Sequence, residues 1–223
     1  GFGQVNVVNA DGVAGYAPRA AYDRIISAAG IMDIPHNWIS QLKPGGRLVV
    51  PIWLDGVQVS AAFEVQPDGG LFSDNNRPSA FVYLRGAEES GHIGKQVGTK
   101  SLYLLADDVD QIDTAALHLL LSDDHDLLYL ESVMESTDYW YGFQLYLMLN
   151  EPAGYIFAVY AVAEGQQAYG LEDHGIVLLT PGSAVFAPYE ASGLLHCYGG
   201  SDASLSLQEA LDDWNALGRP SMQ

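Results

Sequence analysis

Short apolar runs alternate with polar turns along the first part of the chain. Residues 5–8 form a β-prone run closed by a turn-forming Asn-Ala-Asp-Gly stretch, and residues 22–30 predict a second strand that ends in small side chains. Residues 34–42 predict a helix, and the apolar run 47–52 predicts a third strand of the kind that is covered on both faces. Strands that alternate with helices at this spacing predict an α/β sheet.

The pattern then changes to strands joined by polar segments. Residues 57–65 and 80–84 predict an antiparallel pair linked across the polar loop 66–78. Residues 87–100 are rich in glycine and polar side chains, which predicts a linker. The chain therefore divides into a first domain over residues 1–86, the linker 87–100 and a second domain over residues 101–223.

The second domain mixes strands and helices, which predicts an α+β domain smaller than the first. Residues 140–149 are too apolar for anything but a buried helix or strand. Helices are predicted at 114–121, with Asp113 or Thr114 as N-cap, and at 204–217. Strands are predicted at 102–105, 155–162, 176–179, 185–188 and 194–198, with a hairpin turn at 180–183.

Charge separates the two domains. Residues 1–100 contain eight Lys or Arg and nine Asp or Glu, whereas residues 101–223 contain Arg219 and nineteen acidic residues. The acidic half would repel a phosphate backbone, so nucleic-acid binding is not expected. Two interpretations stay open: the charge serves solubility, as in an acid-rich proteome, or it attracts a basic peptide.

Bulk features limit the class of protein further. The chain has 223 residues, and no apolar run reaches the length of about eighteen residues that would predict a membrane span. No basic region followed by an apolar stretch marks a signal peptide at the start. A single cysteine, Cys197, fits a reducing compartment, so a cytoplasmic protein is expected.

Several residue clusters suggest chemistry but lack its context. Gly1-Phe2-Gly3 resembles part of a nucleotide-binding loop, but it precedes a strand instead of following one. Residues 123–126 (Asp-Asp-His-Asp) offer metal ligands, yet no second ligand cluster has metal spacing, so a solvated loop is favoured. Cys197 lies mid-strand, which favours an inert thiol. No metal site is therefore predicted, and the catalytic residues stay unknown.

Two candidate segments remain at the ends of predicted strands. Asp11-Gly12 follows the first strand, and residues 27–30 (Ser-Ala-Ala-Gly) end the second. Ligands of open parallel sheets bind outside the carboxyl ends of the strands. A carboxylate there accepts hydrogen bonds from an amine or a ribose, and small residues on the next strand leave room for the body of the ligand. An Asp-Gly pair is, however, also an ordinary turn.

The spacing of these segments resembles a known family. Residues 7–12 (VVNADG), 22–26 (YDRII) and 41–51 (QLKPGGRLVVP), together with Gly15 and Pro18, resemble the protein-L-isoaspartate O-methyltransferases over residues 1 to about 86. That resemblance implies a class I (Rossmann-like) methyltransferase fold and the cofactor S-adenosylmethionine. It implies a protein or peptide substrate that carries isoaspartate or aspartate.

The resemblance also implies roles for individual residues. Asp11 would accept from the adenine amino group, and Gly12 would give the cofactor backbone room. Ala28 and Ala29 would line the cofactor floor. Tyr83 and Leu84 would lie on the peptide side, although both also suit an ordinary strand interior.

The chain departs from the family pattern in two ways. The family places its glycine-rich cofactor loop and a ribose-binding acidic residue ahead of the strand at residues 5–8, and neither is present here. We therefore expect a partial, Rossmann-like sheet that is inactive alone. Its bare edge strand predicts a homodimer, a swap or cover by the C-terminal domain. The second departure is Trp53, where the family has glycine, which would alter the rim that faces the peptide.

Residues 101–223 resemble, more loosely, the extra C-terminal domain of bacterial isoaspartyl-methyltransferase-like proteins. The resemblance rests on the ending at residues 214–220 (WNALGRP). A function of a different class is an alternative: a non-catalytic peptide-binding module in which the acidic C-terminal domain recruits the peptide.

Overall fold

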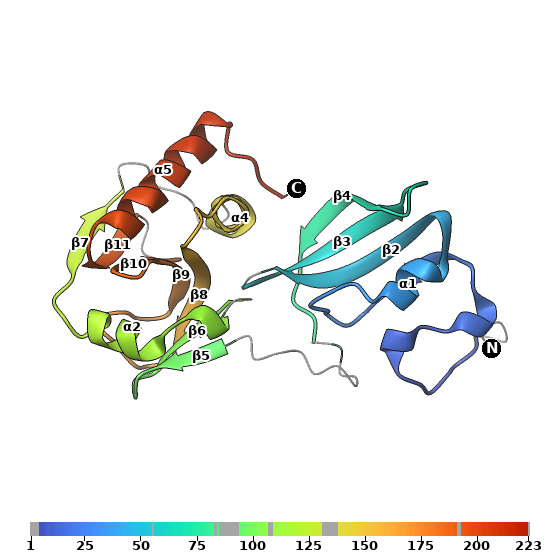
Figure 1. The fold of residues 1–223 in the computed structure, drawn as a ribbon, viewed down its shortest axis with the longest axis horizontal. Helices are drawn as coiled ribbons and strands as arrows, with labels where there is room; N and C mark the ends of the chain where they lie inside the picture. The colour runs from blue at the N-terminus through green and yellow to red at the C-terminus, as the bar shows by residue number, and fades with distance from the viewer. Residues whose placement is uncertain are drawn as a thin grey trace. The chain divides into compact units, whose positions relative to one another are not determined.

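The computed structural model describes residues 5–54, 56–82, 84, 94–106, 109–130, 138–190 and 193–222, without the side chain of Trp140. The chain forms two compact units, residues 1–91 and 92–223 (Figure 1). The C-terminal unit is the longer of the two, whereas the sequence interpretation made the second domain the smaller one.

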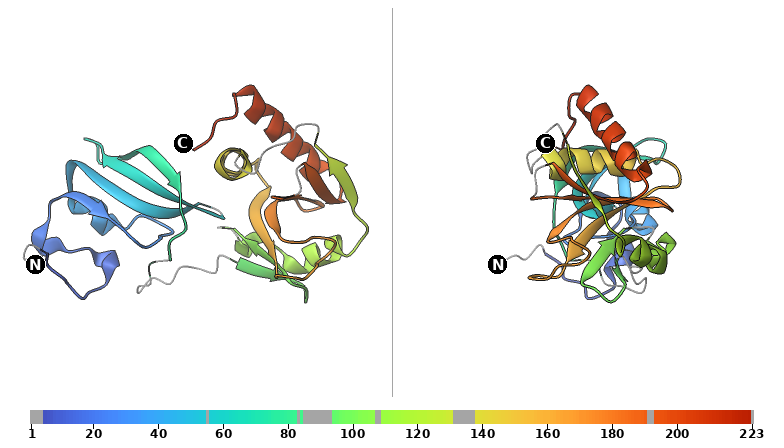
Figure 2. Two further views of the ribbon diagram at one scale, coloured as in Figure 1. Left: turned by 180° about the vertical axis from the view of Figure 1, so that it is seen from behind. Right: turned by 90° about the vertical axis from the view of Figure 1, so that its left-hand side faces the viewer.

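The N-terminal unit contains a four-stranded mixed sheet in the order β1-β2-β3-β4. β1 pairs in parallel with β2, and the other neighbours are antiparallel. The long strands β2 and β3 run side by side in both figures of the fold (Figures 1 and 2). The strands are β1 (Tyr22–Ile26), β2 (Leu42–Leu54), β3 (Val57–Val65) and β4 (Leu71–Pro78).

The core of this unit lies between β2 and the short helix α1 (His36–Ser40). Leu48 and Val50 are fully buried, and Trp38 of α1 packs into the same cluster. The helix is shorter than the predicted 34–42, because Leu42 pairs with Tyr22 and so starts β2. The Lys-Pro-Gly-Gly segment therefore belongs to a strand that shifts register, not to a free turn.

Two other predictions in this unit are wrong. Residues 66–78 were predicted as a loop, but most of them form β4, which replaces residues 80–84 as the partner of β3. β4 is an edge strand, and its polar side chains can face solvent without a desolvation penalty. One of them, Asp74, accepts hydrogen bonds from Arg47 at both carboxylate oxygens. Residues 5–8 form no strand, because no described segment pairs with them.

The C-terminal unit is built on a seven-stranded antiparallel sheet in the order β5-β6-β8-β9-β10-β11-β7. Its predicted strands are confirmed, and the hairpin β9–β10 turns at residues 180–183. β5 lies within the range predicted as linker. The strands are β5 (Gly94–Val97), β6 (Leu102–Leu105), β7 (Asp126–Tyr129), β8 (Ile156–Val162), β9 (His174–Leu179), β10 (Ser183–Pro188) and β11 (Leu194–Gly199).

Helices cover both faces of this sheet (Figure 1). Side chains alternate between the two faces along each strand, so Phe157 joins one core cluster and Tyr160 joins the other. α2 (Thr114–Leu121) packs on the Tyr160 side, while α4 (Gln144–Leu149) and α5 (Asp202–Ala216) pack on the Phe157 side. A π-helical turn, η4 (Tyr139–Phe143), leads into α4.

The predicted N-cap of the helix at residues 114–121 is confirmed. Asp113 caps α2, because its carboxylate accepts from the backbone N–H groups of Ala115 and Ala116. In the part of the chain that the structure describes, no helix is long and apolar enough to cross a membrane. No group of three or more His, Cys, Asp or Glu among the described residues forms a metal site, and Asp126 instead starts β7.

Candidate functional site

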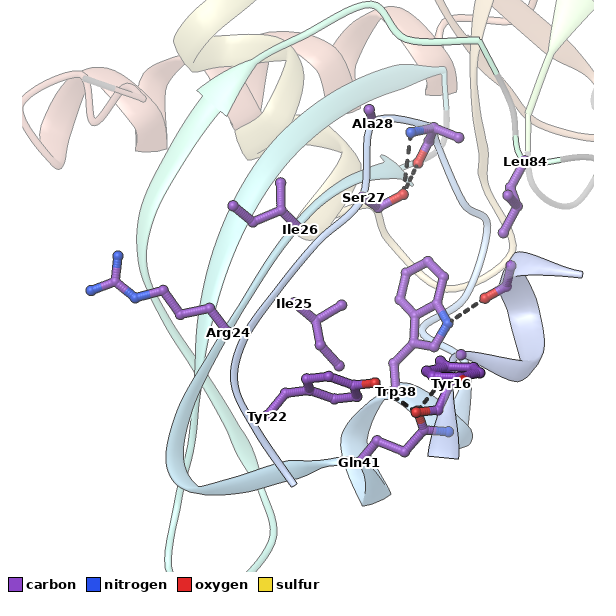
Figure 3. A pocket seen from close by; sticks show the side chains of 13 residues that line it. Tyr16, Tyr22, Arg24, Ile25, Ile26, Ser27, Ala28, Trp38, Gln41 and Leu84 are labelled. Carbon is purple, nitrogen blue, oxygen red and sulfur yellow. Dashed lines mark hydrogen bonds between the residues drawn. The ribbon is translucent and has the colours of Figure 1, made fainter. Parts of the chain in front are cut away.

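A cleft of about 600 Å³ lies in the N-terminal unit beside β1 and its carboxyl end (Figure 3). Its volume falls within the range of about 300–1,000 Å³ that is typical of small-molecule sites. Its walls come from the loop before β1, from β1 and the residues after it, from α1, and from Leu84. The lining residues are Gly12, Gly15, Tyr16, Tyr22, Arg24, Ile25, Ile26, Ser27, Ala28, Ala29, Trp38, Gln41 and Leu84.

One wall is the loop that contains the short 3-10 helix η1 (Gly12–Ala14). Asp11 is its N-cap, and Asp11 Oδ1 accepts from the backbone N–H of Val13 at 3.0 Å. The Trp38 indole Nε1 donates to the carbonyl of Gly12 at 2.8 Å, which ties the loop to α1. The hydroxyl of Tyr22 donates to the carbonyl of Tyr16 at 2.6 Å. The loop is therefore fixed from α1 and from β1.

The opposite wall is the small-residue segment that follows β1. The Ser27 hydroxyl donates to the carbonyl of Ala29 at 2.7 Å and accepts from its N–H at 3.2 Å. Gly30 exchanges backbone hydrogen bonds with Val82 and Leu84, at 2.8 and 2.7 Å. These bonds bring residue 84 to the cleft although more than fifty residues separate it from Ala29.

The electrostatics of the cleft are simple. Arg24 is the one charged side chain among the lining residues named above, and Figure 3 shows it pointing away from Tyr22 and Trp38. The nearest ion pair on β1 is at the surface, where Lys43 Nζ lies 2.6 Å from Asp23 Oδ1. The hydrogen bond from Lys43 lowers the pKa of Asp23 below its ordinary value. The cleft thus suits a ligand held by shape, aromatic surface and backbone polar groups.

The structure brings together most of the residues that the sequence selected. Gly12, Ala28 and Ala29 line the cleft, and Leu84, predicted for the peptide side, lines it as well. Asp11 is exposed next to the cleft and caps η1. Tyr83 lies outside the described residues. The roles of these residues stay predictions.

Other lining residues were not selected from the sequence. Tyr16, Tyr22, Trp38 and Gln41 reach the cleft from three different segments. Trp38 and Gln41 are three residues apart in the predicted helix 34–42, a spacing that places both on one helix face, and this was the available signal. Trp53, by contrast, is buried in β2 and is not among the lining residues.

The residues that form the cleft lie in a segment that is similar to a known protein family. The family model described as "Protein-L-isoaspartate(D-aspartate) O-methyltransferase (PCMT)" matches this chain. Residues 1–89 match it. These PCMT-like residues include every residue of the cleft.

Curated relatives show the same limited overlap. A protein-L-isoaspartate O-methyltransferase of Methylibium petroleiphilum is 47% identical over 87 residues, which cover 38% of this chain and 32% of the relative. One from Methanopyrus kandleri is 40% identical over 84 residues, which cover 38% of this chain and 37% of the relative. The chain thus spans about a third of the length of these relatives.

Two solved structures bear related titles. One protein-L-isoaspartate O-methyltransferase is 19% identical, covers 96% of this chain and 53% of its own, and has a TM-score of 0.37. A Plasmodium falciparum protein, titled as a putative PCMT in complex with S-adenosyl-L-homocysteine, is 26% identical, covers 30% and 29%, and has a TM-score of 0.27. Both scores are low, and neither carries an argument about this chain.

Proposed function

We propose that the N-terminal unit is part of an S-adenosylmethionine-dependent carboxyl O-methyltransferase. Its substrate would be a protein or peptide with isoaspartyl or aspartyl residues. The observation that carries the proposal is that the PCMT-like residues build a cleft at the carboxyl end of β1, the place where ligands bind in open α/β sheets.

The residues present fit such a cofactor. Gly12 is open on the cleft side, since among the described residues a Cβ there would meet Leu84 Cδ1 alone, at 3.5 Å. Ala28 and Ala29 leave the opposite wall without bulk. By the family resemblance, Asp11, exposed at the rim, would accept a hydrogen bond from the adenine amino group. Tyr83 and Leu84 would face the peptide.

The chemistry asks little of the protein beyond alignment. S-adenosylmethionine, when bound, would supply an electrophilic methyl group to a carboxylate oxygen of the substrate. A carboxyl group with a pKa of about 4 is already ionised at neutral pH, so no general base is needed. The cleft residues would hold the two reactants in line and exclude water.

We also propose that these 223 residues alone bind S-adenosylmethionine weakly. The glycine-rich loop that the resemblance places ahead of residues 5–8 is not among them. Half of the cofactor surface would therefore have to come from further residues of a longer form of the protein.

We expect Asp11→Ala to weaken S-adenosylmethionine binding at least about tenfold, the usual effect of losing a hydrogen bond to a charged group. Isothermal titration of the 223-residue chain and of a longer form with the glycine-rich loop measures this. Asp68→Ala is the matched control, because Asp68 is exposed and accepts from the N–H two residues on, as Asp11 does, but lies at the β3–β4 turn.

Each outcome of this titration has a meaning. Tight binding by the 223-residue chain would show that its cofactor site is complete. An unchanged affinity of Asp11→Ala in the longer form would refute the adenine assignment. If neither form binds, the methyltransferase proposal fails and the peptide-binding alternative takes its place.

One observation supports that alternative. β7, an edge strand of the C-terminal sheet, exposes Leu127, Leu128 and Tyr129, with 51%, 46% and 74% of their surfaces accessible. Asp123 and Asp124 lie shortly before it in sequence, and Arg219 is the single Lys or Arg among residues 101–223. A basic, extended peptide would fit beside β7 as an added strand.

We further propose a homodimer formed through the outer edge of β1. No described strand pairs with that edge, and Ile26 on it is 73% exposed. The first hundred residues are nearly neutral, so charge does not oppose self-association of this unit. Sedimentation velocity should show a dimer that Ile26→Lys dissociates, since a charge on an edge blocks pairing. A monodisperse monomer of the unaltered chain would contradict the proposal.

A reducing, cytoplasmic compartment remains part of the proposal. Cys197 is a free, partly buried thiol on β11. Burial raises the pKa of this thiol, which disfavours the reactive thiolate.

A further inference from the structure

We propose that Gln41 is a positioning residue that fixes the rim of the cleft by bridging two points of the loop 12–16. The bridge itself is independent of the proposed function. Its effect on S-adenosylmethionine rests on that function.

The side-chain amide of Gln41 uses both of its ends. Oε1 accepts from the backbone N–H of Tyr16 at 2.8 Å, and Nε2 donates to the carbonyl of Ala14 at 2.9 Å. These contacts cross 25 and 27 residues of sequence. Gln41 is only 7% exposed, so water competes weakly for either bond. Only one orientation of the amide satisfies both partners. The two hydrogen bonds therefore fix the position of the loop relative to Gln41.

The backbone of Gln41 is itself held at a junction. Its N–H donates to the carbonyl of Asn37 at 3.2 Å, and its carbonyl accepts from the N–H of Tyr22 at 2.7 Å. Gln41 therefore ends α1, precedes β2 and touches the start of β1. Because the backbone of Gln41 is fixed by these bonds, its side chain holds the loop at a defined position relative to the sheet.

The loop is shaped to receive this amide. Gly15 has φ 62° and ψ −151°, a combination that is essentially restricted to glycine. A Cβ on Gly15 would lie 2.6 Å from Oε1 and 2.9 Å from Nε2 of Gln41. Glycine thus permits both the backbone turn and the close approach of the amide.

Trp38 completes the attachment from the same face of α1. Its indole donates to the carbonyl of Gly12, while Gln41, three residues later, holds Ala14 and Tyr16. Gly12, Gly15 and Tyr16 all line the cleft. Trp38 of α1 and Gln41, which directly follows the helix, consequently set the spacing between this wall and the Ala28–Ala29 wall, and any ligand that spans the cleft depends on that spacing.

Hydrogen exchange at the backbone amide of Tyr16 tests the bridge directly. Gln41→Leu removes both hydrogen bonds, and exchange at Tyr16 should accelerate about tenfold. Gln41→Glu keeps an acceptor for the Tyr16 N–H but loses the donor to the Ala14 carbonyl, so protection at Tyr16 should be restored only in part, to a level between Gln41→Leu and the unaltered chain. Amides around Val50, which is fully buried in β2, should exchange unchanged, because the opening is local.

Gln58→Leu is the matched control. Gln58 also uses both ends of its amide, since Oε1 accepts from the N–H of Phe81 and Nε2 donates to its carbonyl. Its loss should accelerate exchange at Phe81 and leave Tyr16 unchanged. A merely structural role for Gln41 predicts instead that Leu and Glu variants change Tyr16 and Val50 in parallel with global stability.

Equal protection of Tyr16 in the unaltered chain and in Gln41→Leu would overturn the proposal, whatever ligand the cleft binds. Titration of S-adenosylmethionine into the longer form separates the two ideas. We expect Gln41→Leu to weaken this affinity about tenfold. If exchange verifies the bridge but the affinity is unchanged, the bridge stands and the result counts against the cofactor assignment of the cleft.

Discussion

Trp214→Ala should lower the free energy of unfolding of the C-terminal unit by about 4 kcal/mol, as large-to-small changes of buried tryptophan do. Trp214, on α5, is fully buried. Its ring packs against Phe143 at a centroid distance of 5.7 Å, and its Nε1 donates to the carbonyl of Pro220 at 2.9 Å. A Cβ on Gly142 would lie 2.7 Å from Trp214 Cζ2, so the π-helical turn fits closely around the indole.

The loss combines a cavity with an unpaired carbonyl. Hydrogen exchange of the β8 and β9 amides reports global opening of this unit without assuming that the whole chain unfolds in one step. Leu205→Ala is the control on the same helix, because Leu205 is 58% exposed and its removal should change stability by less than about 0.5 kcal/mol. Similar exchange in both variants would show that α5 does not hold the sheet.

Gly15→Ala should weaken S-adenosylmethionine binding by the longer form about 100-fold, because the backbone strain of a few kcal/mol and the displaced Gln41 amide act on the same loop. The added Cβ cannot coexist with the present position of the amide. The loop must therefore release Tyr16 or Ala14, and the Gly12 wall of the cleft moves with it. Isothermal titration gives the affinity, and exchange at Tyr16 shows whether the loop has opened.

Gly69→Ala controls for backbone strain alone. Gly69 also has positive φ, 86°, but a Cβ there would meet nothing within 4 Å. It lies in the β3–β4 turn, so the variant should lose some stability and keep its affinity. Equal losses of affinity in both variants would mean that general destabilisation, not the shape of the loop, controls binding.

Local sequence signals predicted elements whose partners are also encoded nearby. The predicted α2 helix, its Asp113 cap and the β9–β10 hairpin all appear at the expected positions. The strand predicted at residues 5–8 is wrong, because a β-prone run forms a strand only where another strand offers it hydrogen bonds, and no described strand does so here. The loop predicted at residues 66–78 is wrong because an exposed edge strand, here β4, tolerates the polar side chains that otherwise indicate a loop.

The sequence by itself determined the division in charge, the resemblance of residues 1 to about 86 to the protein-L-isoaspartate O-methyltransferases, and the choice of Gly12, Ala28, Ala29 and Leu84. These depend on residue identity and on spacing within one segment. Only the tertiary structure revealed the bridge from Gln41 to Tyr16 and Ala14. Such a contact depends on how α1 packs over a loop 25 residues away, because side-chain hydrogen bonds are set by distance in space and leave no local pattern in the chain.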